Sequence, residues 1–279
     1  MSHIGGCLRY MGPGEMRAMI NVTREKLGLD KLRSEKLRLD GALVERGLAP
    51  TRSQARDMIK RGCVTVDGAT TTKAAQMVGD RAVIHVQEGA QPYVSRGGLK
   101  LAAALEAFGF DPGGVVALDV GASTGGFCDV LLKRNAAKVY AVDVGRGQLH
   151  PAIAGDPRLV MLEGQDARLL DASIIVEQPV AIVADVSFIS LTKVLGAAMA
   201  LAAPGAWLVA LIKPQFEVGR AEIGKGGVVS DPLARERAVE TVREWVSAQA
   251  GWRVVGVIAS PIAGGSGNVE MLLGARRHG

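Results

Sequence analysis

This chain of 279 residues contains few cysteines and no long hydrophobic run. The three cysteines, Cys7, Cys63 and Cys128, lie far apart and are odd in number, which argues against a disulfide framework and a cysteine-rich zinc site. No apolar stretch reaches the roughly 18 residues that a membrane-spanning helix needs. The N-terminus lacks the apolar segment of a secretory signal. We therefore expect a cytoplasmic protein that neither spans a membrane nor holds a metal ion.

Basic residues are concentrated near one end of the chain. The formal net charge is +5, and residues 31–61 contain nine Lys or Arg but only four Asp or Glu. A localised basic patch is typical of proteins that bind polyanions such as nucleic acids. A solvated helix surface would give the same count. The charge by itself therefore leaves both interpretations open.

Composition and periodicity divide the chain into four parts. Residues 1–36 show little periodicity and predict a poorly ordered leader without chemistry. Residues 37–88 predict a compact unit with two helices, at about 39–46 and 51–61, and strands at 64–66 and 82–86. Residues 89–94 contain Gly89 and Pro92 and predict a linker. Residues 95–275 predict a second and larger domain.

The second predicted helix carries a basic ridge. Thr51 or Ser53 can cap its N-terminus. The basic residues recur at a spacing of four, so they share one face, and one more follows at the helix end: Arg52, Arg56, Lys60 and Arg61.

The residues around this ridge resemble the small RNA-binding domain named after protein S-four of the small ribosomal subunit. The similarity lies in Leu39-Asp40, Leu43-Val44, Arg52-Ser53, Ala55-Arg56, Ile59 and residues 62–68. It implies a small α+β domain whose basic second helix docks on structured RNA through Arg52, Arg56, Lys60 and Arg61. The alternative is a small interaction module whose basic ridge only adds solubility.

Strand and helix patterns alternate through the second domain. The predicted strands are 115–120, 138–142, 159–163, 181–185, 207–212, 253–258 and 269–274; the predicted helices are 99–110, 126–134, 147–154, 172–176, 191–203 and 232–250. Short apolar strands separated by helices predict a mainly parallel, Rossmann-like α/β sheet that is covered on both faces.

A glycine-rich turn follows the first strand of this sheet, at residues 119–127. Glycines there let the backbone turn tightly and approach a ligand closely. The spacing is not that of a phosphate-binding loop of NTPases, and it matches a dinucleotide fingerprint imperfectly. The turn therefore indicates a nucleotide-like ligand without identifying it.

Four aspartates, Asp119, Asp143, Asp166 and Asp185, lie at the carboxyl ends of predicted strands. In an open α/β sheet these ends border the ligand crevice. An acid at Asp143 can accept hydrogen bonds from ribose hydroxyls, and one at Asp166 can accept from an adenine amino group. The alternative for each aspartate is a loop cap.

Five motifs resemble the TlyA, or haemolysin A, family of FtsJ-like ribosomal RNA 2′-O-methyltransferases. They are residues 95–101, 119–127, 185–190, 213–217 and 267–270, and the resemblance extends over about residues 37–274. It implies a seven-stranded class I methyltransferase domain that uses S-adenosylmethionine. The cofactor-binding residues that it implies are Asp119, Gly121, Ser123, Thr124, Gly125, Gly126, Phe127, Asp143, Asp166 and Asp185.

The family relies on a Lys-Asp-Lys-Glu tetrad, which falls here on Lys100, Asp185, Lys213 and Glu270. A ribose 2′-hydroxyl is a poor nucleophile, so it must be oriented and must lose its proton. A lysine acts as the base only after its pKa falls toward neutrality. Lys213 is the predicted base, or it orients the hydroxyl while the proton leaves to water. Lys100 is predicted to position ribose or phosphate, and the two acids to hold the ammonium groups.

Other interpretations remain open at this stage. The chain could be a non-catalytic binder of RNA or ribosomes with a degenerate methyltransferase domain, a membrane-active haemolysin or an NAD-dependent oxidoreductase. Phe188 and Phe216 follow two of the strands and either stack on a displaced base or pack in the core. The family implies a cytidine target in ribosomal RNA or ribosomal subunits. The sequence indicates neither the exact nucleotide nor the oligomeric state.

Overall fold

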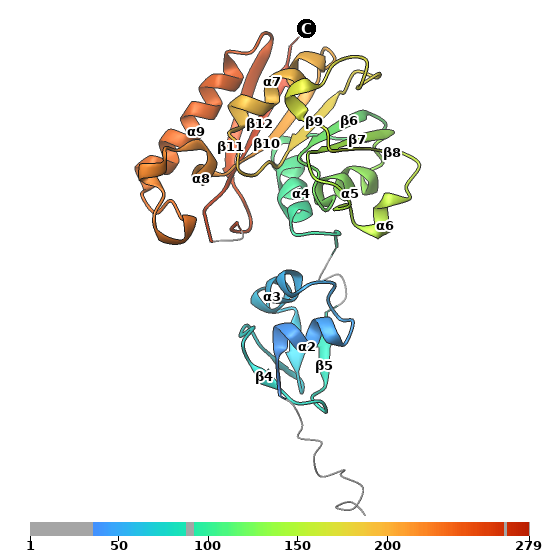
Figure 1. Cartoon of the computed structure of the whole chain (residues 1–279), viewed down its shortest axis with the longest axis vertical. Coiled ribbons are helices and arrows are strands. Elements are labelled where there is room, and N and C mark those ends of the chain that lie inside the picture. The colour runs from blue at the N-terminus through green and yellow to red at the C-terminus, as the bar shows by residue number, and fades with distance from the viewer. Residues whose placement is uncertain (1–35, 88–91, 265–266, 279) are drawn as a thin grey trace, which may run out of the picture. The chain divides into compact units, whose positions relative to one another are not determined.

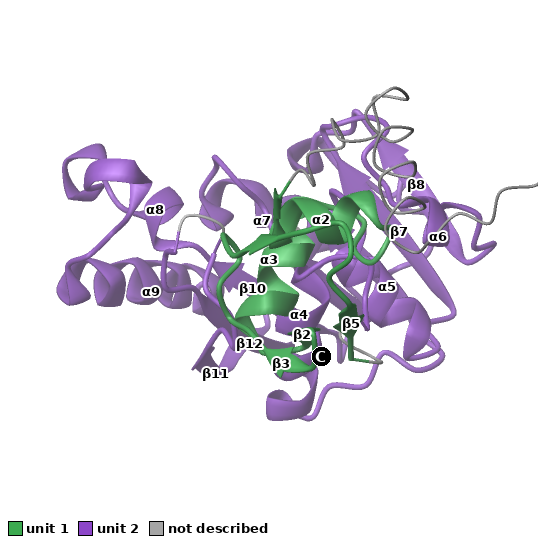
Figure 2. Ribbon diagram, turned by 90° about the horizontal axis from the view of Figure 1, so that it is seen from below, with its two compact units in different colours: residues 1–90 green, residues 91–279 purple. Residues whose placement is uncertain are grey.

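The computed structural model describes residues 36–87, 92–264 and 267–278. The chain divides into two compact units between Ala90 and Gln91 (Figure 2), a point within the predicted linker. All but the last residue of the predicted leader 1–36 lies outside the described residues.

The first unit contains two short helices, α2 (Leu39–Glu45) and α3 (Arg52–Lys60). The Thr51 side chain accepts a hydrogen bond from the backbone N–H of Gln54 at 3.2 Å, so Thr51 caps α3. The apolar side chains of both helices form one buried core with the neighbouring strands. This is the arrangement that the helical spacing predicted.

The strands of the first unit are short. They are β1 (Leu37–Arg38), β2 (Val64–Val66), β3 (Ala69–Thr70), β4 (Met77–Val78) and β5 (Ile84–Val86). β2 lies between β3 and β5, and β1 pairs with β4. Neither β1, β3 nor β4 was predicted, because two residues carry no detectable period. Residues 78–80 suggest a turn in the sequence, but Val78 lies in β4.

The second unit has a seven-stranded sheet in the order β11-β12-β10-β9-β6-β7-β8 (Figure 1). Its strands are β6 (Val116–Val120), β7 (Lys138–Asp143), β8 (Leu159–Glu163), β9 (Ala181–Ala184), β10 (Trp207–Ile212), β11 (Trp252–Ala259) and β12 (Met271–Arg277). β6 to β10 run parallel, and β12 is antiparallel to both of its neighbours. The predicted fold class is confirmed.

Helices cover both faces of this sheet (Figure 1). α7 (Leu191–Leu201) and α9 (Pro232–Ser247) bury their apolar side chains in a cluster on one face. α4 (Gly97–Phe108), α5 (Gly126–Lys133) and α6 (Pro151–Ala154) pack on the other. The parallel strands therefore all end at one edge, which is where the candidate site residues follow them.

Three predictions of local structure are wrong. Residues 172–174 form a single turn, in which the Asp171 carboxylate accepts from the backbone N–H groups of Ser173 and Ile174, and the chain does not continue as a helix. The helix predicted at 147–154 starts only at Pro151, where His150 caps it. The last strand begins at Met271, so residue 270 precedes it.

Within the described part of the chain, no helix is long and apolar enough to cross a membrane.

Candidate active site

The glycine-rich turn after β6 brings two strand ends together. Gly121 has φ +87°, and a Cβ there would lie 2.7 Å from the backbone oxygen of Asp185, which follows β9. The N–H of Gly121 donates to the carbonyl of Val142 at 2.8 Å. A larger residue would therefore collide with the chain after β9, which explains the requirement for glycine.

A cavity of about 490 Å³ lies over these strand ends. Five of the predicted cofactor residues line it: Gly121, Ser123, Asp143, Asp166 and Asp185. The sequence analysis did not select several others that line it, including Gln148, Gln165, Arg168 and Ser187. Of these four residues, only Ser187 lies inside one of the sequence motifs, at residues 185–190.

The other predicted cofactor residues, Asp119, Thr124, Gly125, Gly126 and Phe127, are not among the lining residues of this cavity. The two glycines allow close packing, because a Cβ at Gly125 would lie 2.3 Å from Ile153 and one at Gly126 would lie 2.0 Å from the Ser95 hydroxyl. Phe127 is buried in the core. These residues shape the turn, and their contact with a cofactor remains a prediction.

Asp143 fixes the rim of the cavity. Its Oδ2 accepts from the N–H of Ser123 at 2.8 Å, and its Oδ1 accepts from the N–H of Gly145 at 2.7 Å. Ser123 has φ +47° and donates its hydroxyl to Gln148 Oε1 at 3.2 Å. Both carboxylate oxygens already have one donor each, and each keeps a lone pair for a ribose hydroxyl.

Asp166 is engaged with a neighbour. Its Oδ2 lies 2.5 Å from the Arg168 guanidinium, and hydrogen bonds from Arg168 lower the pKa of this carboxyl to about 2. If Asp166 accepted a hydrogen bond from the adenine amino group of a cofactor, its carboxylate would at the same time stay bound to Arg168. That contact also remains a prediction.

Asp119 is fully buried beneath the turn. The Cys128 thiol donates to its Oδ2 at 3.0 Å, whereas its Oδ1 has no hydrogen-bond partner in the described structure. Burial raises the pKa of this carboxyl to about 7; the charges of Asp185 and Asp143 add to the rise, and the thiol hydrogen bond opposes it. A cation placed nearby would favour its ionised form.

Asp119→Asn is expected to change how stability depends on pH. The folded-state pKa lies above the ordinary value, so the wild-type carboxyl binds a proton that the unfolded chain has released. The free energy of unfolding of the wild type therefore falls as the pH rises from about 4 to about 7, by up to about 1.4 kcal/mol per pH unit. Asparagine removes this contribution. Denaturant unfolding of both proteins at pH 5 and pH 8 measures the difference, and parallel pH profiles would contradict it.

Lys213 and Asp185 form one ion pair at the end of β10. Lys213 Nζ lies 2.6 Å from Asp185 Oδ1 and donates to the Ser187 hydroxyl at 2.8 Å. The side chains of Lys213 and Asp185 are 12% and 23% exposed. The ammonium group is therefore held between two oxygens whose residues, Asp185 and Ser187, line the cavity wall.

Lys100 and Glu270 form a second ion pair, which is buried. Lys100 Nζ on α4 donates to Glu270 Oε2 at 2.5 Å. Glu270 is 3% exposed, and a Cβ at Gly264 would lie 2.4 Å from its Oε1. The neighbouring Asn268 is also buried, and it ties this loop to Gly227 and Val229 through its amide. Asn268 lies inside the 267–270 motif, which by itself does not indicate this role.

The two ion pairs belong to adjacent elements. The antiparallel ladder of β10 and β12 ends at Ile212 paired with Met271, and Lys213 and Glu270 are the next residue on each side. A Cβ at Gly97, one turn before Lys100 on α4, would lie 3.7 Å from Asp185 Oδ2. The structure therefore brings all four predicted catalytic residues to one edge of the sheet.

Two aromatic rings stand beside the Lys213 pair. Phe188 is 91% exposed, and its ring centroid lies 5.1 Å from that of Phe216. Lys213 Nζ lies 5.9 Å from the Phe216 centroid. Phe188 also has φ +65°, which is unusual for a residue with a side chain. Phe188 is thus not a core residue.

Comparisons with known proteins agree with this geometry. The family model of FtsJ-like methyltransferases matches residues 93–277, and that of the S4 domain matches residues 37–84. The TlyA 16S/23S rRNA (cytidine-2′-O)-methyltransferase of Mycobacterium tuberculosis is 48% identical over 87% of this chain and 91% of its own. Hemolysin A of Brachyspira hyodysenteriae is 39% identical over 85% and 98%.

A solved structure from Streptococcus thermophilus, described as that of a candidate hemolysin, is 37% identical with a TM-score of 0.66, and the match covers 88% of this chain and 90% of that one. This chain belongs to the TlyA group of the FtsJ-like methyltransferases. It is therefore a methyltransferase with S-adenosylmethionine as its cofactor, preceded by an S4 domain.

The residues present fit this cofactor. The cavity is large enough for a nucleoside with an amino-acid tail, and Ser123 and Asp143 offer polar groups at its rim. Asp119 has a buried oxygen without a partner close by, and Asp185 and Asp143 add negative charge. Such a site suits a ligand that carries a positive sulfonium group.

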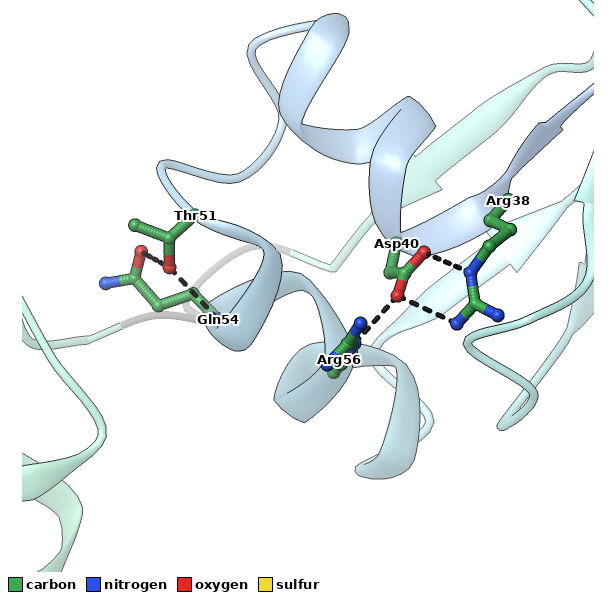
Figure 3. Close-up of polar contacts among 5 residues, drawn as sticks. All are labelled: Arg38, Asp40, Thr51, Gln54 and Arg56. Carbon is green, nitrogen blue, oxygen red and sulfur yellow. Dashed lines mark hydrogen bonds and ion pairs between the residues drawn. The ribbon is translucent and has the colours of Figure 1, made fainter. Parts of the chain in front are cut away.

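The basic helix of the S4 domain is partly neutralised. The buried Asp40 carboxylate accepts from Arg38 and Arg56, and the Arg56 distance is 2.7 Å (Figure 3). Hydrogen bonds from these arginines lower the pKa of Asp40 to about 2. Arg61 lies just after α3 and pairs with Asp57 at 2.8 Å. The predicted ridge therefore consists of ion-paired arginines as well as the exposed Arg52 and Lys60.

Proposed function

We propose that this protein transfers a methyl group from S-adenosylmethionine to the 2′-hydroxyl of a cytidine in ribosomal RNA. The observation that carries the proposal is the Lys213–Asp185 ion pair, held at the wall of the cofactor cavity with the Lys100–Glu270 pair beside it. The curated relative from M. tuberculosis bears the name of this activity. Ribosomal subunits in the cytoplasm are the proposed partner.

The cofactor supplies an electrophilic methyl group on its sulfonium sulfur. The protein must orient the ribose hydroxyl and accept or pass on its proton. The ammonium group of Lys213 lies beside the cavity wall, and Asp185 and Ser187 fix its position. We assign to Lys213 the contact with the 2′-hydroxyl, and to Asp185 its orientation.

Lys100 has a different environment. It is buried against Glu270, so its charge is neutralised locally. It reaches the edge of the sheet from the first turn of α4. We infer that the Lys100–Glu270 pair fixes α4 against the loop before β12. It thereby places the ammonium group of Lys100 near the ribose or phosphate of the target nucleotide.

Phe188 offers a surface for a base. Methylation inside a folded RNA requires the target nucleotide to leave its stack, and proteins often hold such bases against an aromatic ring. The ring of Phe188 is exposed and lies beside the residues proposed for catalysis. Of the two interpretations left open by the sequence, this geometry favours stacking.

The experiment that tests the proposal is methyl transfer with purified protein. The protein is incubated with S-adenosylmethionine labelled in the methyl group and with 30S or 50S subunits from cells that lack the gene. Mapping of 2′-O-methyl marks then identifies the nucleotide. Label that stays out of RNA in both subunits, with cofactor binding shown by calorimetry, would leave the non-catalytic RNA binder as the better interpretation.

The S4 domain is proposed to dock on the RNA through the exposed side of α3. Replacing Arg52 and Lys60 by glutamine is expected to weaken RNA binding and to reduce the slope of log affinity against log salt by roughly one for each phosphate that the variant no longer neutralises. The change spares Arg56 because Asp40 needs it as a partner. Filter binding at several salt concentrations measures the slope.

A matched control is the double replacement of Lys73 and Arg81, which are exposed in the same unit outside α3. It removes the same charge and is expected to leave the slope nearly unchanged. An equal reduction in both proteins would show that net charge, rather than α3, governs binding.

Two other interpretations lack support in the site. An NAD-dependent oxidoreductase would need a different cavity chemistry, whereas the carboxylates here suit a cationic ligand. The name Hemolysin A belongs to the B. hyodysenteriae relative. Lysis of red cells by purified protein without cofactor would revive that interpretation for this chain.

A further inference from the structure

Glu217 connects two segments of the candidate site that are far apart in the sequence. It is the last residue of α8 (Pro214–Glu217), a short helix that begins directly after Lys213. Its Oε1 accepts from the backbone N–H of Leu191 at 2.9 Å, and its Oε2 lies 2.6 Å from the Ser190 hydroxyl. Ser190 and Leu191 are the cap and first residue of α7.

This carboxylate replaces the acid that a capping box would place in the first turn of α7; Ser190 itself is the cap. A helix that begins with a serine cap is often completed by an acid three residues later, which reaches back to the cap. That position in α7 is Lys193, and the first turn of α7 contains no acid. Glu217 supplies the carboxylate from α8 instead, where it also satisfies one of the unpaired N–H groups at the start of the helix.

The loop between β9 and α7 is thereby fixed from both sides. Lys213, at the start of α8, contacts Asp185 and Ser187 at the beginning of the loop. Glu217, at the end of α8, holds Ser190 at its end. Phe188 and Ile189 lie between these anchors, and the ring of Phe188 also contacts Phe216 of α8.

Phe188 needs such anchors. Its φ of +65° is a conformation that residues with a side chain rarely adopt, and it persists only where neighbours impose it. The ring is 91% exposed, so burial of the ring does not hold it in place. The contacts made by α8 are what keep the ring pointing outward beside Lys213.

We propose that Glu217 is a positioning residue for RNA methylation: it ties α7 to α8 and thereby holds Phe188 exposed for stacking on the base of the target nucleotide. The inference rests on the proposed function, because it gives Phe188 a base of the RNA as its partner. Glu217 itself touches neither the RNA nor the cofactor.

The test uses the full-length protein and unmodified ribosomal subunits as substrate. Glu217→Ala is expected to lower kcat/KM for the RNA roughly tenfold, the size of effect that loss of a helix cap or a stacking contact gives. The Kd for S-adenosylhomocysteine is expected to change less than kcat/KM, because Glu217 lies outside the cavity lining, although the loop with Phe188 that it holds is part of that lining. Glu244→Ala, at an exposed position of α9, is the control and is expected to match the wild type.

Glu217→Gln separates the tie from the charge. Its amide oxygen can accept from Leu191 N–H and its NH₂ can donate to the Ser190 hydroxyl, so most of the activity is expected to return. Equal losses for Glu217→Gln and Glu217→Ala would overturn the inference. If Glu217→Ala unfolds at the assay temperature, Glu217→Asp replaces it, because the shorter side chain keeps the charge and breaks the tie.

A double-mutant cycle with Phe188→Ala is the deciding measurement. If Glu217 acts through the Phe188 ring, Glu217→Ala is expected to cost less than about twofold in a protein that already lacks the ring. A full additional tenfold loss in that background would overturn the inference, since it would place the effect elsewhere. Failure of the wild type to methylate RNA would instead contradict the proposed function, so the two failures are distinguishable.

Discussion

Lys213→Ala is expected to abolish methyl transfer while leaving cofactor binding nearly intact. Lys213 is held by Asp185 and Ser187, two residues of the cavity wall. Its loss removes the group that orients the 2′-hydroxyl or takes its proton, which lowers the rate at least about a hundredfold. Single-turnover transfer of labelled methyl to ribosomal subunits measures the rate, and calorimetry with S-adenosylhomocysteine measures binding.

Two variants make this test specific. Lys193→Ala removes a lysine from the exposed side of α7 and is expected to retain full activity. Lys213→Arg keeps the positive charge beside Asp185 but has no lone pair to accept a proton. If arginine restores much of the rate, Lys213 orients the hydroxyl and is not the base. Normal turnover by Lys213→Ala would remove this residue from the mechanism.

The second large effect is expected at the buried Lys100–Glu270 pair. Glu270→Gln leaves the ammonium of Lys100 without its carboxylate, and Lys100→Met leaves the carboxylate alone. Breaking a buried ion pair from one side typically costs about 3–5 kcal/mol in the free energy of unfolding. Chemical denaturation of each single variant measures this cost.

The double variant separates stability from activity. Replacing both Lys100 and Glu270 by methionine removes both charges and keeps similar volumes, so stability is expected to return close to that of the wild type. Methyl transfer is expected to stay low, because the ammonium group of Lys100 is no longer there to position the nucleotide. Recovery of activity in the double variant would show that the pair has only a structural role.

The exposed pair Glu240–Arg243 on α9 is the matched control for the buried one. Both side chains are half exposed and 3.1 Å apart. Pairs of this kind contribute little, so Glu240→Gln is expected to change the unfolding midpoint hardly at all. A single variant at Lys100 or Glu270 that is as mild as this control would contradict the ion-pair argument.

Periodicity was sufficient for most of the fold. The seven strands of the sheet and the helices α4, α5, α7 and α9 lie where the alternation of apolar residues predicted them, with ends shifted by a few residues. Longer elements bury one face, so their pattern is visible in the sequence. The four-residue helix α8 and the two-residue strands have no such pattern, and at residues 172–176 the chain forms only a single turn after Asp171.

The candidate site was only partly predictable. The motifs indicated Lys100, Asp185, Lys213 and Glu270 as a group, and the structure brings them to one sheet edge. Which lysine pairs with which acid depends on the register of β10 against β12 and on the path of α4. Glu217 was not selected at all, because its partners are 26 and 27 residues away and no local spacing reports such a contact.

The sequence by itself determined the order of strands and helices, the glycine turn and the kinds of chemical group available, because each of these depends on neighbours within a few residues. Only the tertiary structure decided that Asp119 is buried with a raised pKa, that the two lysines of the tetrad pair with different acids, and that Phe188 projects into solvent. Burial, ion pairing and exposure depend on which distant segments pack together, and that information is absent from any local pattern.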